Sequence, residues 1–178
     1  QRSSKQNTPN WPLSMDATTM PSIHSLLPKL STDFPDLSFA LGELFSWSPS
    51  QQTVFYSESD PENVTLLLHE LSHGLLEHRR YSKDIELLAM ETAAWDKTLD
   101  LAQKYDIELG EDIAEQNLDT YREWMHARST CPNCDASGYP TKKDTYSCVA
   151  CGETWLVNEA RLCGLKRYTV SKILNNPL

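Results

Sequence analysis

The sequence lacks a long apolar run, and it has few basic residues. No hydrophobic stretch approaches the about 20 residues of a membrane-spanning helix, and no apolar signal-peptide core stands near the start, so we expect no membrane partner. Residues 1–128 contain 10 Lys and Arg against 21 Asp and Glu, a net charge of −11. This part of the chain is therefore a poor candidate for binding the phosphate backbone of nucleic acid.

Cysteine is also scarce, which excludes a fold held together by many disulfides. Four of the five cysteines form two C-x-x-C pairs. Such pairs indicate a zinc site in a reducing compartment rather than a disulfide framework. We therefore expect a cytoplasmic protein.

The length of 178 residues suits one compact domain with a small appendage. Residues 1–20 are polar and predict a flexible lead-in. We expect the main domain to span residues 21–128, and a small metal-binding module with a C-terminal tail to span residues 129–178. Helical and strand patterns both occur in the main domain, so the predicted fold class is α+β.

The patterns predict four helices and one β-hairpin. A helix over residues 21–30 should end or kink at Pro28. The aromatic, loosely alternating stretches 37–47 and 53–57 predict the two strands of the hairpin. The helices that follow are expected from the Ser59-Asp60-Pro61-Glu62 start signal to about Arg80, over residues 83–105 and over residues 110–128.

The stretch at residues 66–77, LLLHELSHGLLE, contains the pattern H-E-x-x-H. On a helix, His69 and His73 lie four residues apart on one face, so both imidazoles can reach one metal ion. Glu70 then lies beside that ion, where it can take a proton from a water molecule. The opposite face carries an apolar stripe, formed by Val64, Leu67, Leu68, Leu71 and Leu75. The alternative is two ordinary histidines on a solvated helix face.

A catalytic zinc usually has three protein ligands. The next predicted helix offers Glu91 and Glu86, and His78 lies nearer in the sequence. The expected buried side of that helix consists of Ile85, Leu88, Thr92, Trp95 and Leu99. Glu91 falls at the border of this side, whereas Glu86 points away from it. Because an acid beside a buried stripe needs a cation, we select Glu91 as the third ligand.

The motif H-E-L-S-H followed by E-T-A-A, which begins at Glu91, resembles the zincin metallopeptidases with a glutamate as third ligand. Among the small intracellular ones it is most similar to the ImmA/IrrE-like group. The resemblance covers residues 37–105. It implies a minimal zincin-like domain in which His69, His73 and Glu91 hold zinc and Glu70 is the general base.

A second resemblance is to the SprT-like proteases, which combine an H-E-x-x-H helix with a terminal zinc ribbon. Their third ligand is a later histidine. Between Arg79 and Met125 the chain has no histidine, so only His78 is left for that role. The overall architecture favours this group, whereas the set of ligands favours the ImmA/IrrE-like group.

Residues 131–151 contain the two C-x-x-C pairs, separated by 13 residues. Two such turns present four thiolates to one metal, here Cys131, Cys134, Cys148 and Cys151, as in the structural site of a zinc ribbon. The module is too small for a core of its own, so the metal should supply most of its folding free energy.

The partner of this ribbon is less evident from its residues. Lys142 and Lys143 stand at the expected hairpin tip, with further basic residues behind them, so contact with nucleic acid is possible. The alternative, which we favour, is a docked module that stabilises the main domain.

These features predict a zinc-dependent endopeptidase with one catalytic and one structural zinc ion and a protein as substrate. A residue that stabilises the oxyanion is also expected, with Tyr81, His78 and Tyr105 as candidates. The rival interpretation is a catalytically silent protein, stabilised by zinc, that regulates a partner or binds DNA. A third is a DNA-associated protease of the SprT type.

Overall fold

The computed structural model describes residues 21–59, 63–110, 112–161 and 163–170, so the expected lead-in at 1–20 lies outside the described residues. The helices within these ranges are α1 (Ile23–Asp33), α2 (Val64–Leu75), α3 (Asp84–Lys104) and α4 (Ile113–Ser129). Strands β1 (Ser38–Leu41), β2 (Ser46–Ser48) and β3 (Thr53–Tyr56) form one sheet. Strands β4 (Gly138–Lys142), β5 (Thr145–Cys148), β6 (Thr154–Val157) and β7 (Arg167–Thr169) form the other.

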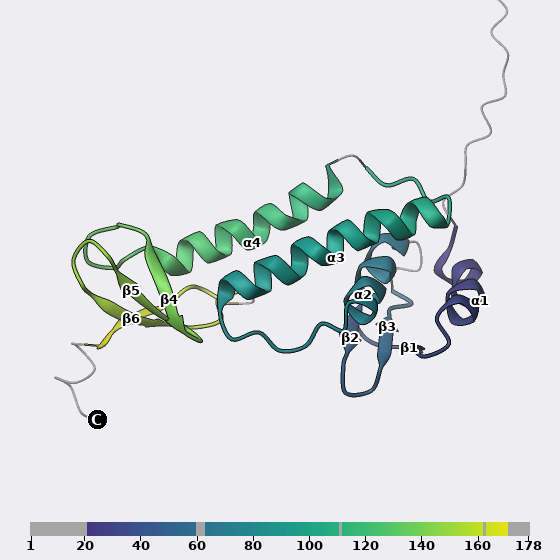
Figure 1. Cartoon of the computed structure of the whole chain (residues 1–178), viewed down its shortest axis with the longest axis horizontal. Coiled ribbons are helices and arrows are strands. Elements are labelled where there is room, and N and C mark those ends of the chain that lie inside the picture. The colour runs from purple at the N-terminus through teal and green to yellow at the C-terminus, as the bar shows by residue number, and fades with distance from the viewer. Residues whose placement is uncertain (1–20, 60–62, 111, 162, 171–178) are drawn as a thin grey trace, which may run out of the picture.

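The predicted α+β class is confirmed. The long helices α3 and α4 run antiparallel along the molecule, and the two sheets lie near its opposite ends (Figure 1). Helix α2 packs between the first sheet and α3. Among the described residues, no helix is long and apolar enough to cross a membrane.

The first sheet differs from the expected simple hairpin. Strands β2 and β3 do form an antiparallel hairpin, but β1 pairs with β3 in parallel, with Ser38 opposite Thr53. The predicted strand 37–47 is thus two strands with a break after Leu41. At the break, a Cβ on Gly42 would lie 3.0 Å from Cβ of Phe55, so the chain passes close to β3 and a side chain there would require a small shift. The alternation of aromatic residues did not reveal this change of direction.

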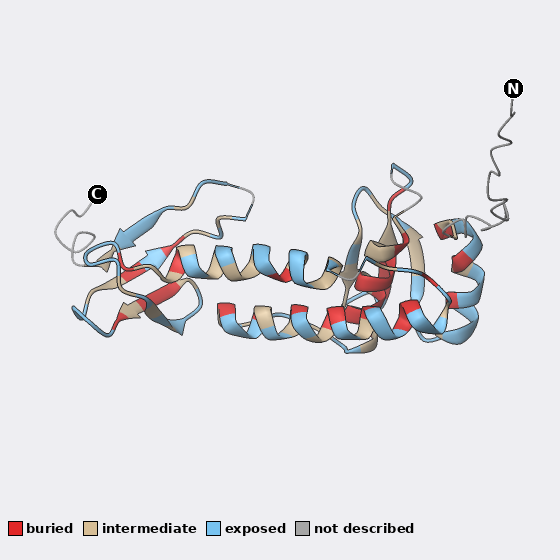
Figure 2. Ribbon diagram, turned by 90° about the horizontal axis from the view of Figure 1, so that it is seen from above, coloured by how far each residue is buried: buried red, intermediate tan, exposed pale blue. Residues whose placement is uncertain are grey.

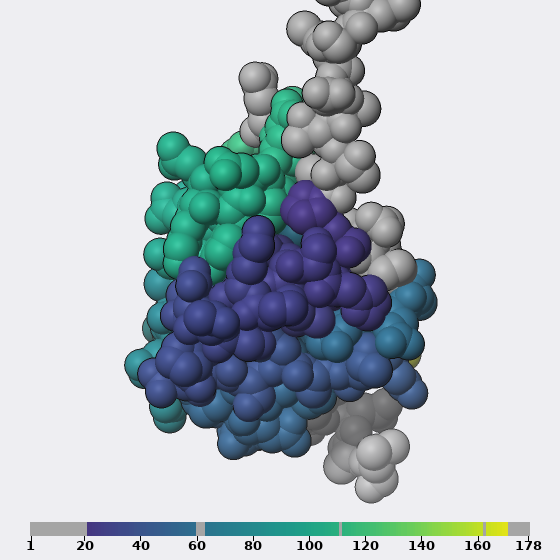
Figure 3. Space-filling view, turned by 90° about the vertical axis from the view of Figure 1, so that its right-hand side faces the viewer, coloured from purple at the N-terminus to yellow at the C-terminus, as the bar shows by residue number. Residues whose placement is uncertain are grey.

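The main core lies between α1, α2 and the first sheet. The predicted stripe on α2 is buried, with Val64, Leu67, Leu68 and Leu71 each 0% exposed. Burial of each such leucine stabilises the fold by about 2 kcal/mol. In Figure 3, residues of α1 and the first sheet, in purple to blue, form this end of the molecule.

Helix α1 continues past the expected end at Pro28 and runs to Asp33. A proline inside a helix removes one hydrogen bond, here the one to the carbonyl of His24. Leu26 and Leu30 are both buried, on either side of the proline, so core packing offsets that loss.

Helix α2 is shorter than expected at its C-terminus and ends at Leu75 rather than near Arg80. Glu77 adopts a left-handed conformation with φ of 52°. The N–H groups of Glu77 and His78 donate to the carbonyls of Gly74 and His73, both at 3.0 Å. This Schellman-type ending turns the chain back on itself. The expected start signal at 60–62 lies outside the described residues, and the side chain of Asn63 caps the helix by accepting from the N–H of Leu66.

The second sheet is fixed to the ends of α3 and α4 by a buried polar cluster. Asp84, at the start of α3, accepts hydrogen bonds from Nε of Arg128 at 2.6 Å and from the hydroxyl of Tyr146. Arg128 is 1% exposed. The indole N–H of Trp155, on β6, donates to the carbonyl of Arg128 at 3.0 Å. Figure 2 shows buried residues, in red, at both ends of the molecule. The expectation that the small module lacks a core of its own is therefore wrong, because Tyr146, Trp155 and Val157 form one with two of the cysteines.

Candidate metal centres

Helix α2 presents His69 and His73 on the side opposite its leucine stripe, as the spacing of four residues predicts. Both side chains are nevertheless buried, because α3 covers this face. The ring of His69 lies against the indole of Trp95, with their centroids 4.4 Å apart. The alternative of histidines on a solvated face is therefore wrong.

Glu91 of α3 meets both imidazoles. Its Oε2 atom lies 3.2 Å from Nε2 of His69 and 3.6 Å from Nε2 of His73, and the two Nε2 atoms are 3.2 Å apart. Two imidazole nitrogens and one carboxylate oxygen thus converge on one point. This set of two histidines and one glutamate matches a known donor set for catalytic zinc, so the residues fit a divalent metal ion.

The sequence placed Glu91 at the border of the buried side of α3, and that detail is wrong. Glu91 is 5% exposed and lies within the buried side, whereas Ile85 and Leu99 are 51% and 42% exposed. The buried face is turned by about one residue from the predicted one. The buried face of α3 was mispredicted from its apolar residues because two of the buried positions, Glu91 and Thr98, carry polar side chains.

The two other candidates for third ligand do not join this group. Glu86 is exposed, and its carboxylate accepts from the N–H and hydroxyl of Ser82 at the start of α3. His78 lies close, but its Nδ1 atom faces Nδ1 of His73 at 2.8 Å, not the nitrogen that meets Glu91. The short helix α2 explains this position, since the chain reverses at Glu77.

The electrostatics of Glu91 and Glu70 differ although both carboxyl groups lie in the same site. Burial alone would raise the pKa of Glu91, but hydrogen bonds with His69 and His73 outweigh it and lower the pKa to about 2. For Glu70, burial dominates and raises the pKa, while the histidines and the main-chain N–H of Trp47 act in the opposite direction. Glu91 is thus held as an anion, whereas Glu70 exchanges a proton more readily.

Two polar atoms beside the site have no hydrogen-bond partner among the described residues. Nδ1 of His69 is buried and makes no hydrogen bond, and the same holds for the indole N–H of Trp95. A histidine that binds metal through Nε2 carries its proton on Nδ1 and normally donates it. The orientation of the His69 ring is therefore fixed by its packing on Trp95. The ring of His73, in contrast, has His78 beside its Nδ1 atom.

A cleft of about 1010 Å³ opens over the group. Its walls include Trp47 and Glu70 on one side, and Tyr121 of α4 on the other. Arg161, which follows β6, also lines it. Burial, followed by the charge of Glu91, raises the pKa of Tyr121 to about 12. Sequence analysis missed Tyr121 and Arg161, because they come from parts of the chain far from the motif.

The expected oxyanion candidates separate in the structure. Tyr81 and His78 line the cleft, but Tyr105 does not belong to it. The hydroxyl of Tyr105 donates to Asp33 at 2.7 Å, near the far end of α3, which excludes Tyr105 from the three candidates.

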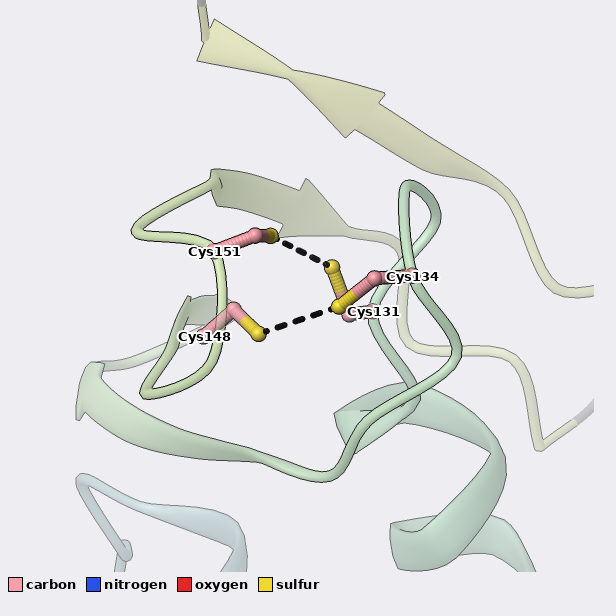
Figure 4. Close-up of side chains that lie close together, drawn as sticks. All are labelled: Cys131, Cys134, Cys148 and Cys151. Carbon is pink, nitrogen blue, oxygen red and sulfur yellow. Dashed lines mark hydrogen bonds between the residues drawn. The ribbon is translucent and has the colours of Figure 1, made fainter.

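The four cysteines of the two C-x-x-C pairs come together at the second sheet (Figure 4). The Sγ atoms of Cys131 and Cys151 lie 3.7 Å apart, and those of Cys134 and Cys148 lie 3.6 Å apart. Four sulfurs at the corners of a tetrahedron around zinc are about 3.8 Å apart for a Zn–S bond of about 2.3 Å. The cluster therefore has the dimensions of a closed metal site.

The two cysteine turns have the same local geometry. In the first, N–H of Asn133 donates to Sγ of Cys131, and in the second N–H of Ala150 donates to Sγ of Cys148, both at 3.4 Å. The residue after each pair is left-handed, with φ of 58° at Asp135 and 73° at Gly152. Hydrogen bonds from N–H of Glu153 and from Asn133 lower the pKa of Cys151 to about 6, which favours the thiolate that metals bind.

Comparison with protein-family models, with curated proteins and with solved structures finds no match. The function is therefore inferred from the two sites themselves.

Proposed function

We propose that the chain is a zinc-dependent endopeptidase that hydrolyses a peptide bond in a protein substrate. The observation that carries the proposal is the convergence of His69, His73 and Glu91 within 3.6 Å of one another, with Glu70 in the same cleft. If the two histidines were only core residues, nothing would require both imidazoles to face one buried carboxylate.

Each residue of the site has a separate role. His69, His73 and Glu91 hold the metal. A zinc ion held there would supply polarisation of the scissile carbonyl and a lower pKa for a water molecule. Glu70 takes the proton of the attacking water and delivers it to the leaving amine. The main-chain N–H of Trp47 orients the Glu70 carboxylate for this transfer.

The second cluster supports a structural role for its metal. Cys131, Cys134, Cys148 and Cys151 fill all four positions of a tetrahedral site and leave none for substrate. The proposed module is a zinc ribbon docked on α3 and α4.

The ligand set favours a zincin with a glutamate as third ligand, similar to the ImmA/IrrE-like group. The SprT-like alternative requires a histidine in place of Glu91. His78 directs its Nδ1 atom to the other side of His73, which argues against that alternative.

Metal content tests the ligands. Zinc per chain, measured by mass spectrometry on the purified protein, should be two for the wild type and one for Glu91→Ala. Glu86→Ala, on the exposed side of the same helix, is the matched control and should keep two. A second zinc retained by Glu91→Ala would contradict the proposed ligand set.

Cleavage of a fluorescence-quenched peptide library tests the chemistry. Glu70→Gln should keep both zinc ions and reduce cleavage at least about 100-fold, since general base catalysis contributes that much. Equal rates for Glu70→Gln and wild type would reject the mechanism. A wild type that binds a partner but cleaves nothing would favour the silent regulator, and cleavage that requires DNA would favour the SprT-like protease.

A further inference from the structure

Two residues from the C-terminal half of the chain meet in the cleft beside Glu91. Nη2 of Arg161 donates a hydrogen bond to the hydroxyl of Tyr121 at 3.0 Å, and its guanidinium carbon lies 4.4 Å from the centre of the Tyr121 ring. Tyr121 belongs to α4, whereas Arg161 follows the last cysteine turn and β6. Both line the cleft together with the three candidate metal ligands.

The direction of this hydrogen bond leaves the Tyr121 proton available. A tyrosine hydroxyl has one proton to donate and can accept through its oxygen, whereas a guanidinium only donates. The oxygen of Tyr121 therefore accepts from Arg161, and its proton points elsewhere. Because Tyr121 lines the same cleft as His69, His73 and Glu91, a group bound in that cleft can accept this proton.

Arg161 is held in place by contacts to α4. The carbonyl of Glu159 accepts from the indole N–H of Trp124 at 2.6 Å and from Nη1 of Arg128 at 3.0 Å. The main-chain N–H of Arg161 donates to the side chain of Glu159 at 3.0 Å. These bonds fix the segment after β6 on the helix that carries Tyr121.

We infer that Tyr121 donates the hydrogen bond that stabilises the oxyanion of the reaction, and that Arg161 positions Tyr121. The inference rests on the proposed function. When the water oxygen bonds to the carbonyl carbon, the π electrons of the C=O bond move to the carbonyl oxygen. Tyr121 donates to this oxygen and keeps its proton, while the charge of Arg161 strengthens the donor. The C-terminal module is thereby part of the active site.

Kinetics with the peptide library test the role of Tyr121. Tyr121→Phe should lower kcat about 100-fold with little change in KM, because the bond forms only as the oxyanion develops. Tyr139→Phe, which removes an exposed hydroxyl outside the cleft, is the matched control and should stay within about twofold of wild type. Zinc content and melting temperature of both variants should equal those of the wild type.

The role of Arg161 has its own test. Arg161→Ala should lower kcat by a smaller factor than Tyr121→Phe, and Arg161→Lys should restore part of the loss, since lysine also donates to the Tyr121 oxygen. In the Tyr121→Phe background, Arg161→Ala should have little further effect on kcat. An undiminished effect there would show that Arg161 does not act through Tyr121.

Binding of inorganic phosphate gives a readout that does not require catalysis. Phosphate is a tetrahedral anion and serves as a probe of the oxyanion position. Its dissociation constant for the zinc-loaded protein, measured by calorimetry, should rise about tenfold in Tyr121→Phe and not in Tyr139→Phe.

The two tests separate this inference from the proposed function. If the wild type cleaves the library and Tyr121→Phe behaves like Tyr139→Phe, the inference is wrong and the peptidase stands. If the wild type cleaves nothing but phosphate binding depends on Tyr121, the anion donor is supported and the peptidase is rejected. Phosphate affinity that is equal in wild type and Tyr121→Phe would overturn the assignment of the donor.

Discussion

The Nδ1 atoms of His73 and His78 lie 2.8 Å apart. The other ring nitrogen of His73, Nε2, is the one that faces Glu91. A histidine that binds metal through Nε2 carries its proton on Nδ1 and needs an acceptor for it. Burial and then the neighbouring His73 lower the pKa of His78, so His78 stays neutral and can accept. The carbonyl of His78 in turn accepts from the indole N–H of Trp47 at 3.0 Å, which fixes its position.

The first prediction concerns this pair. His78→Ala should weaken zinc binding by the group of His69, His73 and Glu91 about 10- to 100-fold, because His73 loses the acceptor that orients its ring. Competition with a chelator of known affinity measures the change. His24→Ala, on the exposed side of α1, is the control and should have no effect. Unchanged affinity in His78→Ala would contradict the positioning role.

The second prediction compares a cysteine of the four-cysteine cluster with one outside it. Cys148→Ser should remove one zinc per chain and unfold the second sheet, since the metal supplies much of the folding free energy of so small a module. Zinc content and near-ultraviolet circular dichroism, which reports the stacked rings of Tyr146 and Trp155, measure both effects. Cys163→Ser is the control, because Cys163 is exposed and outside the cluster. Two zinc ions in Cys148→Ser would reject a four-cysteine site.

The third prediction concerns the attachment of the ribbon. Asp84→Ala should destabilise the protein by about 3–5 kcal/mol, because it leaves Arg128 buried without its main counter-ion. Arg122→Ala breaks exposed ion pairs with Glu115 and Asp119 and should cost at most about 1 kcal/mol. Denaturant unfolding compares the two variants. A small effect of Asp84→Ala would mean that the cluster around Arg128 does not hold the module.

The fourth prediction is a pH dependence of the metal-free protein. In the fold the pKa of Glu91 is lowered from 4.5 to about 2, because hydrogen bonds with His69 and His73 outweigh burial. Ionised Glu91 therefore stabilises the fold above about pH 4.5, and the contribution, at most about 3 kcal/mol, is lost as the pH falls towards 2.

Urea unfolding of chelator-treated protein at several pH values measures this dependence. Glu91→Gln should remove it, and Glu43→Gln, at an exposed position, should leave it in place. The same acid-induced loss in Glu91→Gln would show that another group is responsible.

The helices of the site could be read from the sequence because their signals are local. The apolar stripe of α2 and the spacing of His69 and His73 depend only on the helical period. The same holds for the bounds of α3, predicted as 83–105 and found as Asp84–Lys104. The two cysteine turns are also local, since each one is four residues long.

Other features depended on contacts between distant residues, and here the predictions were wrong or missing. The parallel pairing of β1 with β3 joins segments that no turn connects directly. The end of α2 at Leu75 was not predictable from the sequence either. The left-handed residue that follows it is Glu77, whereas glycine is the residue that usually marks such an ending. Tyr121 and Arg161 had no motif to mark them.

The sequence by itself determined which side chains could bind a metal, because a helix or a cysteine turn sets their relative directions over a few residues. Only the tertiary structure decided that Glu91 completes the histidine pair, that His78 supports His73, and that a segment beyond the ribbon reaches the cleft. The contacts of Glu91 and Arg161 join side chains 20 or more residues apart, and the packing of α2, α3 and α4 fixes them where no local pattern encodes them. His78 is likewise held by a distant residue, since its carbonyl accepts from Trp47.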